Sequence, residues 1–340
     1  ISWCLLFGGM LWLGSPLLAQ NNATQSCVEC HQEQISKNFV HGPTASDCAS
    51  CHKTIEGQVH NNDNTGGLTL VAQGKDLCYG CHEDISAQFD LRYKHEPAEN
   101  GDCTGCHDPH TSNSMKMVAN TAPTLCFSCH SAMNTGRTEA AVVHAPSFEQ
   151  GACSTGHVPH ASTIRRLLTK GSKELCLDCH NKRIQKEDET ILENIAQHID
   201  NNEFIHKALN KRCTSCHNAH YASRELMLKE NFPIATYVKG VEENFTLCFD
   251  CHDADLLNLP ETEYTLFRDG QRNLHYVHVN KDKGRNCTLC HDMHAAQNAQ
   301  LIATTVKFGR WDMPLNYVPT DDGGTCATGC HKELSYSRGE

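Results

Sequence analysis

The chain has 340 residues, with 29 basic and 40 acidic side chains and a formal net charge of −11. Proteins that bind nucleic acid need a basic face, so this charge tells against that class. Hydrophobic residues make up 39% of the chain only because 22 cysteines are counted among them, and aromatic residues make up 6%. Such a composition excludes a large conventional core, although the length alone would suggest about two domains.

Residues 1–19 (ISWCLLFGGMLWLGSPLLA) form an apolar stretch that ends in small residues. This pattern is typical of a secretory signal peptide, and we expect cleavage after Ala19 and export to the periplasm. Neither an initiator methionine nor a basic segment precedes the stretch, so we interpret the leader as N-terminally truncated. A membrane anchor is the alternative, but the run is slightly short for one, and no later apolar run could span a membrane.

Closely spaced cysteine pairs followed at once by histidine dominate residues 20–340. Nine of them are C-x-x-C-H, and the tenth, CATGCH, has one extra residue. The cysteine pairs are Cys27 and Cys30, Cys48 and Cys51, Cys78 and Cys81, Cys103 and Cys106, Cys126 and Cys129, Cys176 and Cys179, Cys213 and Cys216, Cys248 and Cys251, Cys287 and Cys290, and Cys326 and Cys330. This is the attachment signature of c-type haem, in which both thiols bond to the porphyrin and the histidine ligates its iron.

Other metal sites explain the pattern less well. A zinc site needs no histidine directly after each second cysteine. A disulfide framework accounts for paired cysteines but not for the histidines, and iron–sulfur clusters need converging thiolates. We therefore predict haem at each of the ten motifs.

An eleventh motif, CSTGH at Cys153, has Gly156 where the second cysteine is expected, yet it keeps His157. We predict a haem held there by a single thioether from Cys153. The alternative is that this haem has been lost, or that the sequence contains an error at this position.

The 23 histidines suit a protein in which most irons carry two of them. Eleven are proximal candidates: His31, His52, His82, His107, His130, His157, His180, His217, His252, His291 and His331. The other twelve are distal candidates: His41, His60, His95, His110, His144, His160, His198, His206, His220, His275, His278 and His294. Methionine ligation, which raises the potential of a haem, is not needed, so we expect mostly low potentials.

The motifs form an internal repeat. After a first motif at Cys27 come five repeats, at about 41–94, 95–143, 144–200, 201–274 and 275–340, within one multihaem domain over 20–340. Each repeat has a leading motif with small or polar residues between its cysteines and a trailing motif that is usually richer in bulky residues. Each also has an upstream histidine 7 to 9 residues before the leading motif. The upstream histidines are His41, His95, His144, His206 and His278.

A downstream histidine stands three residues after the leading motif in four repeats, and it is displaced in the first. The downstream histidines are His60, His110, His160, His220 and His294. This leaves His198 and His275 as extras, one of which could serve the first haem.

Between the motifs we expect short α-helices, irregular loops and little β-structure, organised around closely packed haems. We predict an amphipathic helix over residues 182–200, because the apolar side chains there follow helical spacing. These are Ile184, Ile191, Leu192 and Ile195. Residues 296–325 form an insertion in the last repeat, and LIATTVKF within it is typical of a strand. With so few apolar residues, we expect folding to depend on haem attachment.

The alternation of CASCH, CTGCH, CTSCH and CTLCH with LCYGCH, LCFSCH, LCLDCH and LCFDCH resembles the doubled C-x-x-C-H repeat of multihaem cytochromes c. Size and haem count resemble the periplasmic decahaem cytochromes of outer-membrane porin–cytochrome conduits. That resemblance implies a bis-histidine haem chain for electron transport in extracellular or anaerobic respiration. It also implies a β-barrel partner and an outer-surface cytochrome. The Cys153 and Cys326 motifs depart from the pattern.

Two other functions stay open. A multihaem reductase of a small oxyanion needs an iron with an open position, but no C-x-x-C-K motif is present and spare histidines are plentiful. If such a site exists, the Cys153 haem is the best candidate. A polymerised cytochrome filament would use a surplus histidine to ligate iron in the next subunit.

Overall fold

The computed structural model describes residues 27–60, 66–186, 188–210 and 212–339, and the predicted leader at 1–19 lies outside these ranges. The chain divides into two compact units. The first comprises Ile1–Leu125 and Val158–Leu167, and the second comprises Cys126–His157 and Leu168–Glu340. These divisions fall inside predicted repeats and not between them.

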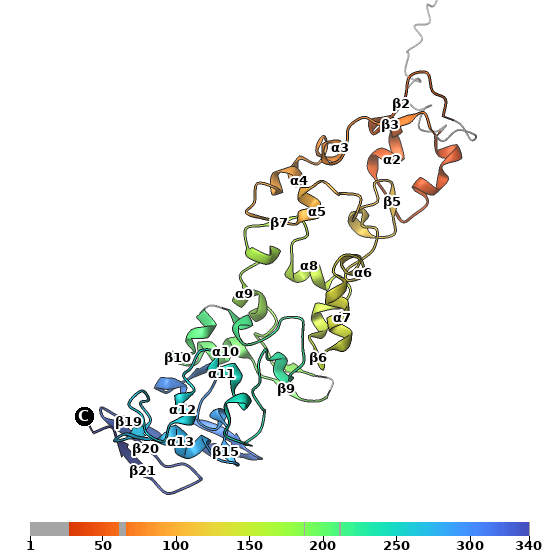
Figure 1. The fold of residues 1–340 in the computed structure, drawn as a ribbon. Helices are drawn as coiled ribbons and strands as arrows, with labels where there is room; N and C mark the ends of the chain where they lie inside the picture. Colours follow the sequence, from red (N-terminus) through yellow and green to blue (C-terminus); the bar gives the residue numbers. More distant parts are fainter. Residues whose placement is uncertain (1–26, 61–65, 187, 211, 340) are drawn as a thin grey trace, which may run out of the picture. The chain divides into compact units, whose positions relative to one another are not determined.

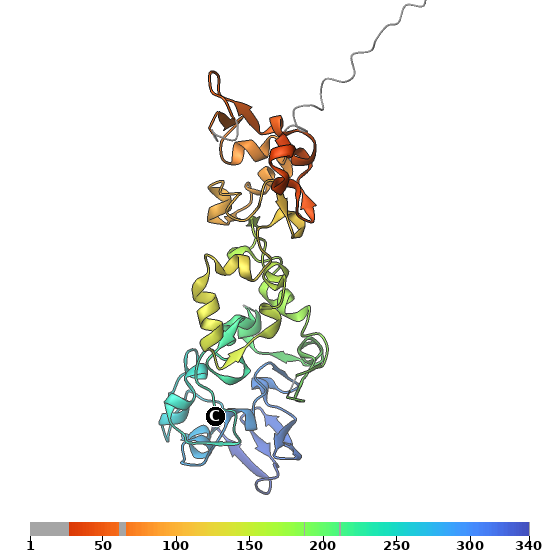
Figure 2. The same cartoon turned by 90° about the vertical axis from the view of Figure 1, so that its right-hand side faces the viewer.

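The first compact unit consists of short elements joined by irregular chain (Figures 1 and 2). Its helical elements are η1 (Gln32–Ile35), α2 (Gly42–Ser46), η2 (Cys48–Ser50), α3 (Lys75–Tyr79), α4 (Glu83–Gln88), α5 (Glu96–Glu99), η3 (Met115–Met117) and η5 (Arg165–Leu167). Its strands are β1 (Phe39–Val40), β2 (His52–Thr54), β3 (Leu68–Leu70), β4 (Tyr93–Lys94), β5 (Thr111–Ser112) and β7 (Ala161–Ser162). Helix α6 (Thr124–Phe127) spans the division between the units.

The second compact unit is built in the same way. Its helical elements are α7 (Ser131–Glu139), η4 (Ala145–Ser147), α8 (Ala152–Gly156), α9 (Ser172–Leu177), α10 (Ile195–Asp200), η6 (Lys207–Asn210), η7 (Cys213–Ser215), η8 (Glu225–Met227), η9 (Glu242–Asn244), α11 (Thr246–Phe249), α12 (Asp255–Asn258), α13 (Leu274–Val279), η10 (Cys287–Leu289) and η11 (Ala299–Leu301). Its short strands are β6 (Val142–Val143), β8 (Ile184–Gln185), β9 (Ile191–Leu192), β10 (Phe204–Ile205), β11 (Tyr221–Ala222), β12 (Tyr237–Val238), β13 (Arg268–Asp269), β14 (Arg272–Asn273), β15 (Gly284–Arg285) and β16 (Ala295–Ala296).

The C-terminal part of the second unit contains the longer strands. They are β17 (Thr305–Phe308), β18 (Trp311–Pro314), β19 (Tyr317–Thr320), β20 (Gly323–Cys326) and β21 (Leu334–Ser337). Strands β17 and β18 form a hairpin, and β19, β20 and β21 form a three-stranded sheet in that order. The strand predicted within LIATTVKF is confirmed over Thr305–Phe308.

Two-residue antiparallel pairs join consecutive repeats at four places. The strand before an upstream histidine pairs with the strand after the downstream histidine of the next repeat. These pairs are β1 with β5, β4 with β7, β6 with β11, and β10 with β16. Each of these strand pairs therefore packs the segment before one repeat's upstream histidine against a segment of the next repeat.

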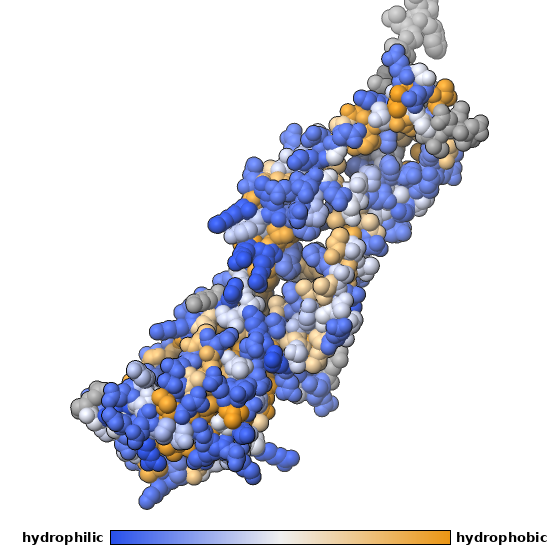
Figure 3. Space-filling model, viewed as in Figure 1, coloured by the Kyte–Doolittle hydropathy of each residue, from blue (hydrophilic) through white to orange (hydrophobic). Residues whose placement is uncertain are grey.

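Hydrophobic cores are small. One cluster contains Leu289, Ala303, Val306, Met313 and Leu315, and another contains Val238, Phe245 and Leu257. Elsewhere hydrophobic residues reach the surface among hydrophilic ones (Figure 3). Side-chain packing alone therefore buries little of this chain.

The expected fold class is confirmed: the described chain is mostly irregular, with short helices and little β-structure. The helix predicted over 182–200 is wrong for most of its length. Strands β8 and β9 form a hairpin in which Ile184 faces Leu192, and only Ile195–Asp200 is helical. Asn194 starts that helix by accepting a hydrogen bond from the Gln197 N–H.

Over the described ranges, no helix is long and apolar enough to cross a bilayer.

Candidate functional site

The cysteine motifs adopt one recurring turn. In nine motifs the N–H of the histidine donates to the carbonyl of the first cysteine, at 2.9–3.2 Å. This bond closes a single helical turn, which brings both thiols and the imidazole to the same short segment. The degenerate motif keeps the turn, with 2.9 Å between His157 N and Cys153 O.

Within the described residues, nine pairs of histidine rings face one another with ring centroids 6.0–6.3 Å apart and interplanar angles of 14–37°. Each pair joins a motif histidine to one of the twelve others. The pairs are His31 with His60, His82 with His41, His52 with His110, His107 with His160, His180 with His144, His157 with His220, His252 with His206, His217 with His294, and His291 with His275.

The spacing of these pairs matches two imidazoles on one iron. A ring nitrogen lies about 1.1 Å from its centroid and binds a first-row metal such as zinc at about 2.0–2.1 Å, so two rings on opposite sides of one metal have centroids about 6.3 Å apart. Direct ring contact would bring stacked rings closer. No group of three or more His, Cys, Asp or Glu side chains within the described ranges converges as a zinc site requires.

The pairs follow a rule that crosses the repeats. A downstream histidine faces the leading motif of the preceding repeat, as His294 of the last repeat faces His217 of the fourth. An upstream histidine faces the trailing motif of its own repeat, as His206 faces His252. The last repeat has no successor, and there His275 faces the leading His291.

The first haem motif fits the same rule. His31 faces His60, the downstream histidine of repeat 1, and neither His198 nor His275 takes that place. His198 instead directs Nε2 at Asp292 Oδ2 and at the Ala295 carbonyl, each at 3.0 Å. His198 is thus engaged by repeat 5 without facing any motif histidine.

Backbone carbonyls hold the leading-motif histidines at Nδ1. The contacts are His107 to Lys116 O (2.8 Å), His217 to Leu226 O (2.8 Å) and His291 to Gln300 O (2.9 Å). A carbonyl only accepts, so Nδ1 carries the proton and the lone pair of Nε2 is left for a metal.

Unusual turns present these three carbonyls. Two consecutive residues in each have positive φ, near +53° to +60°, as in a type I′ turn. They are Lys116–Met117, Leu226–Met227 and Gln300–Leu301, and Arg166–Leu167 also has positive φ at both residues. None is glycine, so each turn stores strain of about 1–3 kcal/mol per residue, which is characteristic of functional positions.

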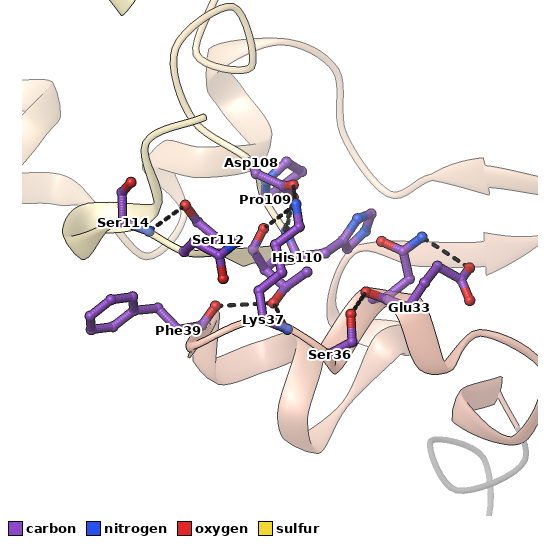
Figure 4. Close-up of polar contacts among 12 residues, drawn as sticks. Glu33, Ser36, Lys37, Phe39, Asp108, Pro109, His110, Ser112 and Ser114 are labelled. Atoms are coloured by element: carbon purple, nitrogen blue, oxygen red, sulfur yellow. Dashed lines mark hydrogen bonds and ion pairs between the residues drawn. The ribbon is translucent and has the colours of Figure 1, made fainter. Parts of the chain in front are cut away.

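Several distal candidates are held in a similar way. His41 and His95 direct Nδ1 at the carbonyls of Pro109 and Pro159, each at 2.9 Å. Figure 4 shows the surroundings of His110 in the first compact unit. The Lys37 ammonium donates to Asp108 Oδ2 at 3.1 Å, and Asp108 Oδ1 accepts from the His110 N–H at 3.0 Å. Asp108 therefore ties the backbone of His110 to the Lys37 side chain, which fixes the loop that carries His110.

Burial keeps these rings neutral, the form that binds iron. Desolvation lowers the pKa of His275 to about 4. It also lowers the pKa of nine other histidines: His110, His144, His160, His180, His206, His220, His278, His291 and His294.

Thiols of consecutive motifs approach one another in chain order. In the first compact unit the neighbours are Cys27 and Cys48, Cys51 and Cys78, and Cys78 and Cys103. In the second they are Cys176 and Cys213, Cys216 and Cys248, Cys248 and Cys287, and Cys290 and Cys326. Burial, followed by the charge of neighbouring cysteines, raises the pKa of Cys78 and Cys290 to about 11.

The second compact unit contains an open cavity with mostly apolar walls. Arg137, Val143 and Phe148 line this cavity, which has a volume of about 400 Å³. The Nε of Arg137 is buried and has no hydrogen-bond partner within the described residues. An apolar wall with an unpartnered guanidinium nitrogen suits a porphyrin with its propionate.

Two motif histidines remain, His130 and His331. His130 and its upstream histidine His95 belong to different compact units. His331 of the last motif and its upstream histidine His278 form no ring pair at 6.0–6.3 Å within the described residues. Sequence reasoning missed the rule across repeats and the strained turns, although the three-residue spacing of four downstream histidines was a signal for the rule.

The family described as Doubled CXXCH motif matches residues 41–87, 95–135, 144–185 and 206–256. The matched segments begin at four of the five upstream histidines and cover more than half of the chain. A search of curated proteins found no match.

Proposed function

The chain belongs to the doubled CXXCH motif family, and from this premise we propose that it relays electrons along a row of eleven covalently attached haems. The paired motifs indicate a multihaem c-type cytochrome that binds haem c. When bound, haem supplies an iron that alternates between the ferric and ferrous states.

The proximity of thiols in consecutive motifs, each near enough to influence the pKa of the next, carries this proposal. Thioethers bond to the edge of the macrocycle, so two neighbouring thiols bring two macrocycle edges together. Electron tunnelling falls off steeply with the gap between edges, and short gaps make a fast relay. Within each compact unit the neighbouring thiols follow chain order, from Cys27 to Cys103 and from Cys176 to Cys326.

Histidine pairs and backbone carbonyls would hold the haems of this relay in a fixed geometry. We propose that each of the nine facing histidine pairs would hold one haem iron between its two rings. Backbone carbonyls at Nδ1 fix several of these rings and their tautomers, which would reduce reorganisation when the iron changes charge. Two histidines on each iron favour low potentials.

The degenerate motif is included among the eleven. It keeps the turn from Cys153 to His157, and His157 faces His220 at 6.1 Å like the other pairs. We propose a haem held there by the Cys153 thioether alone. The open-site interpretation of this motif loses support, because its distal histidine stands in the usual place.

Multihaem c-type cytochromes are typically exported, and we propose a periplasmic location with outer-membrane association. The partners would be a β-barrel and an outer-surface cytochrome, docked through the acidic surface of this chain. A filament would need a surplus histidine, and His198 is instead bonded within its own chain.

Protein-film voltammetry tests the relay. Holoprotein adsorbed on an electrode should exchange about eleven electrons per chain at negative potentials. The variant Cys213→Ala/Cys216→Ala, which lacks one haem inside the second compact unit, should slow electron exchange of the remaining haems. An unchanged rate in this variant, or potentials above zero for most haems, would refute the proposal.

A further inference from the structure

The last motif departs from the recurring turn. Its extra residue means that the His331 N–H donates to Thr328 O, at 3.4 Å, and not to the carbonyl of Cys326. His331 directs Nδ1 at the carbonyl of Lys332, the next residue, at 2.6 Å. The leading-motif histidines use a carbonyl nine residues away. The imidazole of His331 is therefore held differently from theirs.

The distal side of this motif also departs from the rule. Three other trailing histidines, His82, His180 and His252, face the upstream histidine of their own repeat at 6.1–6.3 Å. His278 is the upstream histidine of repeat 5 and lies near enough to His331 to feel its charge. In the described chain, however, no ring faces His331 at that distance.

Helix α13 explains why His278 is not aligned. The helix carries His275 as well as His278, and His275 is committed to His291 at 6.3 Å. The Asn273 side chain fixes the start of α13, donating to three carbonyls and accepting from the Tyr276 N–H. A shift of α13 toward His331 would break the pair of His275 with His291.

The His278 side chain is also held by contacts with its neighbours. Its Nδ1 donates to the Leu274 carbonyl at 2.7 Å, and its ring lies 5.5 Å from the ring of Phe267 at an interplanar angle of 31°. Phe267 also packs edge-on against His275 and Tyr336, at 5.2 Å each. These contacts hold the ring of His278 in place in α13.

We propose that the iron of the last motif has an exchangeable sixth position that binds small exogenous ligands of the carbon monoxide class. This inference rests on the proposed function, because it requires haem at the Cys326 motif. The iron at this end of the chain is then a reactive terminus, whereas the nine facing pairs close nine of the other irons to ligands. Cys330 is exposed, so solvent reaches this motif.

Carbon monoxide titration of the dithionite-reduced, full-length holoprotein tests the proposal, after intact mass has established the number of haems. We expect one carbon monoxide per chain and one high-spin ferric iron in the oxidised protein. The variant Cys326→Ala/Cys330→Ala should lose one haem by mass and lose carbon monoxide binding with it. The control His275→Ala, which opens the His291 iron, should raise binding from one to two per chain.

The variant His278→Ala separates the proposal from ordinary ligation. Under the proposal its stoichiometry stays at one. Wild-type protein that binds none, together with His278→Ala that binds one, would establish His278 as a firm ligand and overturn the proposal. Binding that survives loss of the last haem would overturn it too. If intact mass shows no haem at all, the proposed function itself fails, which is a different result.

Discussion

Replacing His294 tests the ligation across repeats. His294 belongs to repeat 5 but faces His217 of repeat 4, with ring centroids 6.2 Å apart. The variant His294→Ala should remove one axial ligand from the iron of the Cys213 motif. That iron should become five-coordinate and high-spin, and its potential should rise because a strong ligand is lost.

The expected magnitude follows from the haem number. One iron in eleven changes, so the high-spin signal should grow by about 9% of total iron. Low-temperature EPR of the oxidised protein measures this fraction against the wild-type spectrum. His198→Ala is a matched control, since His198 and His294 both bond to Asp292 but only His294 faces a motif histidine.

Double variants identify the affected iron. In a Cys213→Ala/Cys216→Ala background, His294→Ala should add no high-spin iron, because the affected haem is already missing. In a Cys287→Ala/Cys290→Ala background it should still add one. The reverse pattern would mean that His294 serves its own repeat, and the pairing rule would be wrong.

Three further predictions concern the Cys153 motif, helix α13 and the cofactor. Gly156→Cys should add a second thioether, seen by mass mapping of the haem peptide, because a Cβ there meets only Leu175 Cδ2 at 3.8 Å; a peptide that still carries one thioether would contradict the predicted geometry. Asn273→Ala should lower the free energy of unfolding by about 2–3 kcal/mol, because a cap is lost and three partly buried carbonyls lose a donor; guanidinium unfolding measures this, and a loss below about 0.5 kcal/mol would be too small for that role. The chain without haem should show no cooperative thermal transition by circular dichroism, since few side chains are buried; a sharp transition would show that the polypeptide packs by itself.

The sequence predicted the fold class and the motif positions because covalent attachment imposes a local pattern. The proximal histidine must follow the second cysteine, so the motif is visible in five residues. The helical turn that recurs in the motifs follows from that short spacing, even at Cys153, where one thiol is missing.

The pairing of histidines could not be predicted because spacing records distance along the chain and not through space. His52 and His110 are far apart in sequence, and the strands that bring such residues together contain only two residues each. Strands this short have no hydrophobic period. The strained turns are equally hidden, since Lys116 and Met117 carry no glycine or asparagine signal for positive φ.

The helix predicted over 182–200 failed for a local reason. Its four apolar residues also suit a hairpin, and the turn chemistry decides between the two structures. Asp188 Oδ1 accepts from the Thr190 N–H at 3.0 Å, and Glu189 has a φ of 64°. An Asx turn of this kind ends one strand and starts the next.

Intact mass of the exported chain, measured under denaturing conditions, tests the central claim most directly. Covalent haems survive denaturation, so the mass should exceed that of the polypeptide by eleven haem increments. A mass equal to that of the polypeptide alone would contradict haem attachment, and with it the electron relay.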